Sequence, residues 1–358
     1  MKHYKIERVL KSNKKFLILK CLNSLNKEVI LKISLLESNT LEREFERLIN
    51  LSNYSDEKIT YVKPLVFSKF IEGPFKSLYY YEQEFIRSST FSKKIRECKV
   101  SDYDHINDLF LPLEMNSYKI SEVEHYSSYI STNISLFSLI NDYLEFLSNS
   151  FFYKNLFSQD YIFFKNSKLK NLGYSINLIL KSKKYNEFVH KPLKMVLSHA
   201  NYHGDNLLPS DNGISIIDPD VSIPIVPRSF ALARFIYTFV HDSADYGDYD
   251  VFTKWFSHGE PIFDFKSNIS NEVTNSYKKI FGDLLDFNDA KFMIFDNLNY
   301  FSSTELKLSY LFCLLRGIKA NQSNINFSSK NGLDYFQEKG LFIYLNCVKY
   351  VNWMLKEI

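Results

Sequence analysis

The sequence predicts an α+β protein, with a small β-rich lobe followed by a larger and mostly helical lobe. Short apolar, β-branched runs bounded by polar turns fill the first hundred residues. Helical periodicity dominates after about residue 120, with one short β-type interruption from His199 to Asp218. At 358 residues, the chain is also too long for one compact core. We therefore expect two lobes, residues 1–95 and 96–358.

The strands of the first lobe are read from short apolar runs. Residues 16–20 and 28–33 are two such runs, separated by a polar turn at 23–27. Further strands are expected at 61–67 and 77–86.

Helices are predicted from apolar residues that recur at helical spacing. One helix is expected over 42–51, because four apolar residues from Leu41 to Ile49 fall on one face. Periodicity then runs from about 122 to 152, and the clearest helices of the second lobe span 303–318 and 335–356.

Composition excludes several classes of protein. The 44 basic and 41 acidic residues nearly cancel, which gives no electrostatic reason to expect nucleic acid or a membrane surface as partner. No apolar run approaches the roughly 18 residues that a membrane-spanning helix needs. The four cysteines are far apart, so we expect neither a zinc site nor a disulfide framework, and a cytoplasmic location. No glycine precedes Gly73, which excludes an N-terminal glycine-rich phosphate loop.

The chemistry is concentrated in residues 196–220, VLSHANYHGDNLLPSDNGISIIDPD. Two strand-like runs there are joined through Asn212-Gly213, the strongest short signal for a β-hairpin. Such a hairpin brings Asn206, before its first strand, close to Asp218, after its second. An amide oxygen and a carboxylate at one end of a hairpin suit Mg²⁺, whose remaining ligands are phosphates and waters.

This segment resembles the catalytic loop of the aminoglycoside phosphotransferase and choline kinase-like family, within the protein-kinase-like superfamily. The family pattern H-G-D-x-x-x-x-N, followed by a strand ending in I-D, is matched without a gap by 199–206 and by Ile216-Ile217-Asp218. The resemblance implies a bilobal protein-kinase-like fold and a small-molecule kinase that uses ATP and Mg²⁺. It further implies that Asn206 and Asp218 hold the metal, that His203 lies near the transferred phosphoryl group, and that His199 supports the loop.

Weaker matches occur in the family's order in the first lobe. Lys32, in Val29-Ile-Leu-Lys32, is similar to the strand lysine that holds the α- and β-phosphates, and Glu44 to its ion-pair partner. Glu84-Phe85 begins a segment that resembles the hinge whose backbone meets adenine. Taken singly, Lys32 is more typical of a solvated strand lysine, and only its neighbours in the family's order favour the phosphate-binding role. Glu44 is equally typical of a surface charge.

Two positions depart from the family pattern. Asn201 stands at the position of the catalytic aspartate, and Ala231 replaces an aspartate of the helix beneath the loop. An amide cannot accept a proton, so Asn201 cannot serve as a general base. Asp205 is the preferred substitute base, whereas Asp220 is expected to help hold magnesium or water; both are also compatible with ordinary loop acids.

Two functions remain open from the sequence. The first is an ATP- and Mg²⁺-dependent phosphotransferase that acts on a small molecule, such as a hydroxylated or sugar-like metabolite. The second is a catalytically impaired, pseudokinase-type protein that binds nucleotide or a partner, which the substitution at Asn201 favours. The acceptor itself cannot be read, because the helices after residue 122 carry no diagnostic motif.

Overall fold

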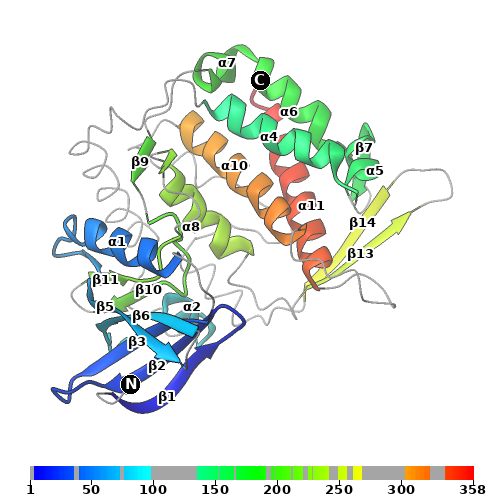
Figure 1. The fold of residues 1–358 in the computed structure, drawn as a ribbon. Coiled ribbons are helices and arrows are strands. Elements are labelled where there is room, and N and C mark those ends of the chain that lie inside the picture. Colours follow the sequence, from blue (N-terminus) through cyan, green and yellow to red (C-terminus); the bar gives the residue numbers. More distant parts are fainter. Residues whose placement is uncertain are drawn as a thin grey trace. The chain divides into compact units, whose positions relative to one another are not determined.

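The computed structural model describes residues 4–35, 40–72, 76–97, 135–151, 153–164, 167–190, 195–197, 199–210, 213–220, 225–227, 229–241, 249–255, 261–267, 303–322 and 335–358. Contacts divide the chain into two compact units, whose elements are labelled in Figure 1. The first contains the described residues of 1–94 and 196–226, and the second those of 95–195 and 227–358. The contacts thus group 196–226 with the N-terminal strands, whereas the sequence analysis assigned it to the larger lobe; the lobe boundary near residue 95 stays a prediction.

An antiparallel sheet with the strand order β1-β2-β3-β6-β5 forms the first part of unit one. Its strands are β1 (Lys5–Ser12), β2 (Phe16–Leu22), β3 (Glu28–Ser34), β5 (Pro64–Glu72) and β6 (Lys76–Glu84). The expected turn at 23–27 joins β2 to β3, and the Asn23 side chain accepts hydrogen bonds from the backbone amides of Leu25 and Lys27. Alternation along the strands gives the sheet two distinct faces. One face buries a cluster of Leu19, Cys21, Val29, Leu31, Ile33 and Leu78.

Helix α1 (Thr40–Ser52) packs on the other face of this sheet. Leu41 and Leu48 of the helix form a buried cluster with Tyr81 of β6. The buried stripe of α1 also includes Glu44 and Arg47, two charged side chains that the apolar pattern did not place in the interior. The helix therefore places both apolar and charged side chains against this face of the sheet.

A second, smaller sheet in unit one contains the predicted hairpin. β10 (Leu207–Ser210) pairs with β11 (Gly213–Ile216), and Ser210 faces Gly213 across a two-residue connection. β4 (Ile59–Tyr61) runs parallel to β11. A Cβ on Gly213 would collide with the Lys58 carbonyl oxygen, and the φ of Gly213 is +139°, so only glycine suits this position.

Two expectations for unit one need correction. The strand expected at 61–67 is two strands, because the chain leaves β4 at Tyr61 and begins β5 at Pro64. β1 was not predicted at all. Its eight residues, KIERVLKS, are all exposed, so they lack the apolar alternation that identifies a half-buried strand.

Unit two is built mainly from helices around α10 and α11. α10 packs against α11, α8 and α4, and α11 also packs against α6, as Figure 1 shows for the orange and red helices. The expected helices at 303–318 and 335–356 are confirmed as α10 and α11. The helices are α2 (Phe91–Arg96, which begins in unit one), α4 (Leu136–Asn149), α5 (Lys154–Phe157), α6 (Leu172–Lys181), α7 (Lys183–Val189), α8 (Phe230–His241), α10 (Ser303–Gln322) and α11 (Tyr335–Leu355).

Residues 96–358 contain more β-structure than the sequence predicted. A four-stranded sheet has the order β13-β14-β7-β8, and β9 (Met195–Leu197) pairs with β12 (Ile225–Pro227). Strands of three or four residues are too short for periodicity to separate them from helix, which explains most of the error. The four strands are β7 (Tyr161–Phe164), β8 (Ser167–Lys170), β13 (Tyr249–Trp255) and β14 (Pro261–Ser267).

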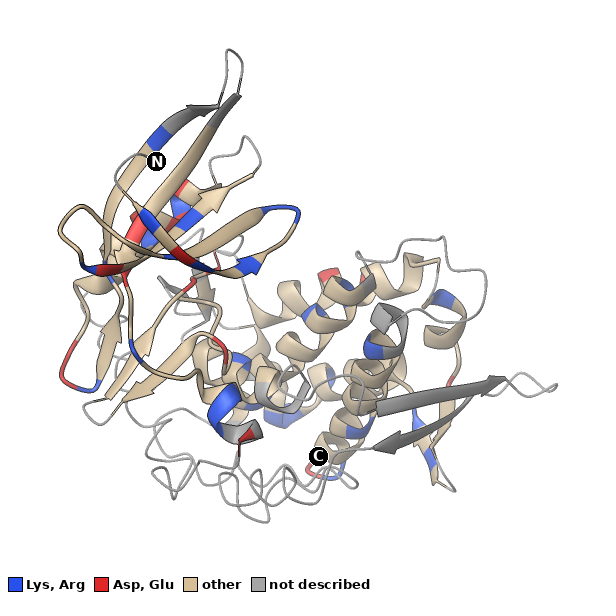
Figure 2. Ribbon diagram, turned by 90° about the horizontal axis from the view of Figure 1, so that it is seen from below, with Lys and Arg blue, Asp and Glu red and all other residues tan. Residues whose placement is uncertain are grey.

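Charges of both signs are interspersed along the described strands and helices, as Figure 2 shows. Among the described residues, no helix is long and apolar enough to cross a membrane.

Candidate active site

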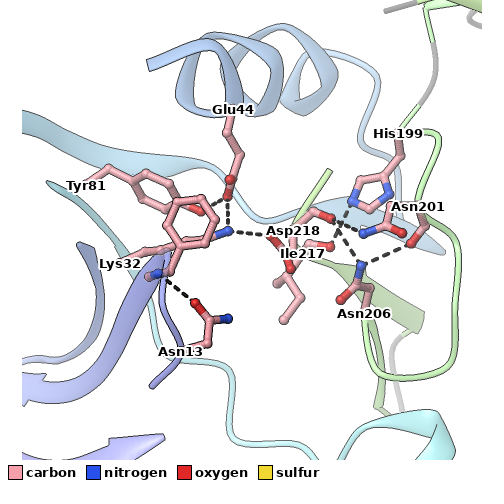
Figure 3. Close-up of polar contacts among 10 residues, drawn as sticks. Asn13, Lys32, Glu44, Tyr81, His199, Asn201, Asn206, Ile217 and Asp218 are labelled. Carbon is pink, nitrogen blue, oxygen red and sulfur yellow. Dashed lines mark hydrogen bonds and ion pairs between the residues drawn. The ribbon is translucent and has the colours of Figure 1, made fainter. Parts of the chain in front are cut away.

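A buried ion pair links β3 to α1. Lys32 Nζ lies 2.6 Å from Glu44 Oε1, and the two residues are only 5% and 3% exposed. The Tyr81 hydroxyl donates to the same Glu44 oxygen, and Lys32 Nζ also contacts Asp218 Oδ1 (Figure 3). The pairing implied for Lys32 and Glu44 is therefore present, and Asp218 extends it into a three-membered charge cluster.

The electrostatics of this cluster reflect burial opposed by mutual attraction. Burial raises the pKa of Glu44 to about 7, although the Lys32 ammonium opposes this shift. Burial alone would lower the pKa of Lys32, but the Glu44 and Asp218 carboxylates outweigh it and raise that pKa. For Asp218, the attraction to Lys32 outweighs burial and lowers the pKa of the carboxyl group. Lys32 and Asp218 are thus charged at neutral pH.

The β10–β11 hairpin brings Asn206 and Asp218 together at its open end. Asn206 is 4% exposed, and its Nδ2 donates to the carbonyl oxygens of Asn201 at 3.0 Å and of Asp218 at 3.1 Å. The Ile217 amide donates to the Asn206 carbonyl at 3.1 Å. Because both Nδ2 protons of Asn206 are used, its Oδ1 is left to accept a hydrogen bond or to bind a cation.

The side chain of Asn201 makes a hydrogen bond to the segment that contains Asp218. Its Nδ2 donates to the carbonyl oxygen of Asp218 at 3.0 Å, so Asn201 and Asn206 converge on one acceptor (Figure 3). Asp218 has a φ of 61°, in the left-handed region that residues other than glycine seldom adopt. The residue at the expected position of a base thus acts as a hydrogen-bond donor to the strained segment.

His199 is buried beneath the same segment. Its Nε2 lies 2.8 Å from the carbonyl oxygen of Ile217, and its own carbonyl accepts the Asp220 amide at 3.0 Å. Burial lowers the pKa of His199 to about 3, so the ring is neutral at pH 7 and Nε2 carries the proton that Ile217 accepts. The ring packs near Tyr61 and Tyr202, whose hydroxyls are 2.9 Å apart.

The remaining candidates lie around this loop. The His203 amide donates to the Asn201 carbonyl at 2.9 Å, and an electrostatic interaction with His203 is among the smaller causes that lower the pKa of Asp218. Asp205 is exposed in the turn before β10, and Asp220 is half-buried beyond Asp218. The roles assigned to His203, Asp205 and Asp220 stay predictions.

A cavity of about 700 Å³ opens beside the charge cluster, a size typical of small-molecule sites. Lys32 and Asp218 line it together with Glu84 and Phe85, so the strand lysine and the expected hinge border one space. Apolar side chains supply much of the rest: Val9, Leu10, Ile18, Ile30, Leu208 and Ile217.

The donor set fits a hard divalent cation bound together with phosphates. Asp218 offers a carboxylate and Asn206 an oriented amide oxygen, whereas the described residues contain no group of three or more His, Cys, Asp and Glu side chains suited to hold a metal alone. Magnesium is typically bound by one or two such protein oxygens plus substrate phosphates. These residues could therefore hold Mg²⁺ together with the phosphates of a nucleotide.

Sequence reasoning missed three side chains at the site. Arg47 is 6% exposed and donates from Nη1 to the carbonyl oxygen of Asp220. Tyr81 contacts Glu44, and Gln83 lines the cavity. The available signal was helical spacing, because Arg47 lies three residues after Glu44 on the same face of α1.

The segment after β6 is hydrogen-bonded to residues 199–210. The Ser92 amide donates to the Gly204 carbonyl at 3.1 Å, and Ser88 Oγ donates to the Pro209 carbonyl. A Cβ on Gly204 would collide with Ser92 Oγ, so this glycine is required by close approach.

Comparison with known proteins shows which fold this is. No family model matches the chain. No curated protein matches it either. Solved structures do match. The apo form of a thermostable mutant of aminoglycoside phosphotransferase APH(4)-Ia is 10% identical, with a TM-score of 0.52 over 97% of this chain and 94% of that chain. A further variant of that mutant, in a ternary complex with ADP and hygromycin B, is 9% identical, with a TM-score of 0.51 over the same shares. A spectinomycin phosphotransferase, APH(9)-Ia, in complex with ADP and spectinomycin is 12% identical, with a TM-score of 0.45 over 97% and 95%.

The chain therefore has the α+β, protein-kinase-like fold of the aminoglycoside phosphotransferases. The fold expected from residues 199–218 is confirmed.

Proposed function

We propose that this chain is an ATP- and Mg²⁺-dependent phosphotransferase that acts on a small molecule, such as a hydroxylated or sugar-like metabolite. The observation that carries the proposal is the placement of Lys32. Its ammonium joins Glu44 to Asp218 at the edge of a cavity bordered by Glu84 and Phe85. A buried cation, a carboxylate beside it and an apolar slot form a site suited to the phosphates and base of a nucleotide. A structure of the same fold contains ADP and hygromycin B, which supports a nucleotide and a small acceptor.

In this proposal the nucleotide's parts contact different elements. The base lies between the apolar side chains of Ile18 and Ile30 on one side and Leu208 and Ile217 on the other, with the backbone at Glu84 and Phe85 along its edge. Lys32 holds the α- and β-phosphates, and Glu44 keeps the ammonium in place.

Asn206, Asp218 and Asp220 would hold magnesium on the phosphates. When bound there, magnesium would supply positive charge against the phosphoryl oxygens, on which negative charge develops during transfer.

In the transfer step, His203 contacts the γ-phosphate. The bond from the γ-phosphorus to its bridging oxygen breaks, a bond to the acceptor oxygen forms, and Asp205 takes the acceptor proton. Phosphoryl transfer depends mainly on positioning and electrostatics, so the absence of a base at Asn201 is compatible with catalysis.

The described cysteines, Cys21, Cys313 and Cys347, are buried free thiols, which is consistent with a reducing compartment. We accordingly place the reaction in the cytoplasm.

Two measurements test the proposal. First, ATP with Mg²⁺ should raise the melting temperature, because a ligand at 100 times its Kd stabilises by about 2.7 kcal/mol. Second, ATP consumption should be measured across sugars, amino alcohols and aminoglycosides, with Asp218→Ala as the control for metal binding. Phosphotransfer that survives Asp218→Ala would refute the assignment of the metal site, and the absence of any nucleotide effect would refute the function.

A nucleotide-binding protein without transferase activity is the second candidate. The hydrogen bond from Asn201 Nδ2 to the Asp218 carbonyl favours it, because the position of the usual base is occupied by a structural contact. Tight nucleotide binding with no turnover on any acceptor would select this candidate.

A further inference from the structure

The backbone of Asp218 lies in an uncommon conformation. Its φ of 61° is in the left-handed region, which few residues other than glycine, asparagine and aspartate adopt. Contacts on both sides fix this conformation. The His199 ring donates from Nε2 to the carbonyl of Ile217, just before Asp218. The backbone carbonyl of His199 accepts the amide of Asp220, just after it, so the segment is hydrogen-bonded on both sides of Asp218.

The carbonyl oxygen of Asp218 itself is held by two amides. Asn201 Nδ2 lies 3.0 Å from it, and Asn206 Nδ2 lies 3.1 Å from it. One carbonyl oxygen has two lone pairs, so these donors satisfy it fully. The two asparagines are also joined to each other, because Asn206 Nδ2 donates to the Asn201 carbonyl at 3.0 Å. Asn201, Asn206 and Asp218 thus form a closed hydrogen-bonded unit.

An ionised aspartate at position 201 would not fit this unit. A carboxylate only accepts hydrogen bonds, so in the same rotamer the carboxylate oxygen that replaces Nδ2 would lie against the carbonyl oxygen of Asp218. The carbonyl would lose one donor and gain a repulsive neighbour. Alanine would remove the donor without adding repulsion, because it has no polar side-chain atom.

We propose that Asn201 is a positioning residue: its side-chain amide fixes the backbone of Asp218 and thereby aims the Asp218 carboxylate at the nucleotide-bound cation. This inference rests on the proposed function for the identity of the cation. It predicts that restoring aspartate at this position damages the site, whereas a simple loss of the base predicts that aspartate improves it.

The test measures Mn²⁺ binding to the ATP complex by electron paramagnetic resonance, with no need for turnover. The variants are Asn201→Ala and Asn201→Asp, and Asn50→Asp on the exposed face of α1 is the matched control. Loss of a group that orients a metal ligand costs about 10–100-fold in metal affinity. We expect Mn²⁺ affinity to fall in the order Asn, Ala, Asp at position 201, with the loss for Asn201→Asp in that range. Asn50→Asp should match the parent.

A second measurement keeps the inference separate from a general loss of folding. The affinity for ATP without metal should stay within about twofold of the parent in both variants that remain folded, because Asn201 contacts neither Lys32 nor the hinge in this account. If Asn201→Asp does not fold while Asn201→Ala does, the Ala variant still has to show weaker Mn²⁺ binding with unchanged ATP binding. Mn²⁺ affinity equal to the parent in either folded variant, or faster turnover by Asn201→Asp, would overturn the inference alone. A parent that binds neither ATP nor Mn²⁺ would instead overturn the proposed function and remove the premise of this inference.

Discussion

Arg47 Nη1 donates to the carbonyl oxygen of Asp220, one turn along α1 from the position at which Glu44 pairs with Lys32. Helix α1 therefore contacts the segment around Asp218 by two routes. One runs through Lys32 to the carboxylate, and the other runs directly to the backbone two residues later. A movement of α1 would alter both contacts together.

Replacing Arg47 should lower the affinity for Mg²⁺ more than the affinity for the nucleotide. Arg47→Met keeps most of the buried side-chain volume but leaves the Asp220 carbonyl without its charged donor, a change that costs about 1.5–3 kcal/mol of stability. The loop after Asp218 should then hold Mg²⁺ less firmly, which would raise the Mg²⁺ concentration that half-saturates ATP-induced thermal stabilisation. Glu46→Met, on the exposed face of the same helix, is the control and should shift stability by less than about 0.5 kcal/mol. Equal behaviour of the two variants would contradict a special role for Arg47.

Lys32 and Glu44 should be strongly coupled. Lys32→Met removes one member of a buried pair and should lower the free energy of unfolding by about 3–5 kcal/mol in urea titrations. The double variant Lys32→Met/Glu44→Gln should recover part of this loss, because a neutral amide can still accept the Tyr81 hydroxyl. Both variants should lose the thermal stabilisation by ATP. A double variant no more stable than Lys32→Met would show that the cost does not come from leaving Glu44 buried without its cationic partner.

Much of the fold followed from patterns that one strand or helix carries by itself. The apolar runs that became β2 and β3 and the spacing that became α1 are local, and so is the turn signal that joins β10 to β11. β1 carried no such signal, because every residue in it is exposed. The strands β7 and β8 were missed because four residues are too few to establish a period.

The members of the candidate site could be predicted where a sequence motif fixes their spacing along the chain. They could not be predicted where tertiary packing brings separate elements together. Asn206 and Asp218 could be paired because a hairpin must bring its ends together. Asn201 was recognised as a departure, but only the tertiary structure shows its amide donating to Asp218. Arg47 and Tyr81 reach the site from separate elements, α1 and β6. Helical spacing places Arg47 on the face of Glu44, but nothing in the local sequence marks Tyr81 as a member of the site.

Gly204 should not tolerate a side chain. In Gly204→Ala, the new Cβ would collide with Ser92 Oγ and lie 3.0 Å from the Ser92 backbone nitrogen. Because Ser92 is itself buried and bonded to Gly204, neither segment can move apart without losing that hydrogen bond. We expect a loss of about 1–3 kcal/mol in the free energy of unfolding. Adding Ser92→Ala should recover part of it by removing Oγ; a fully stable Gly204→Ala would show that the loop adapts.

Asp205 is expected to accept the proton of the acceptor. Asp205→Asn should lower kcat by at least about 100-fold at saturating ATP while leaving nucleotide affinity unchanged, because the residue is exposed in the turn before β10. Asp142→Asn, an exposed position on α4, is the control and should turn over like the parent. Turnover by Asp205→Asn at the parent's rate, with a flat profile between about pH 6 and 9, would indicate an acceptor that is already ionised.

His199 should make stability depend on pH in the acidic range. Burial lowers its pKa to about 3, whereas a histidine in an unfolded chain titrates near 6.5. Between these values the unfolded chain binds a proton that the folded protein does not, so this residue's contribution to stability is full above pH 6.5 and is lost as the pH falls. Linkage gives a loss of about 2 kcal/mol between pH 8 and pH 5 from this residue.

The measurement compares the free energy of unfolding at pH 8 and pH 5 for the parent and for His199→Gln. Glutamine does not titrate, and its side-chain amide can still donate to the Ile217 carbonyl. The drop in stability between the two pH values should therefore be about 2 kcal/mol smaller in the variant than in the parent. His190→Gln, which removes an exposed histidine at the end of α7, should keep the parent's drop. If His199→Gln also keeps it, His199 is not neutral and buried in the folded protein.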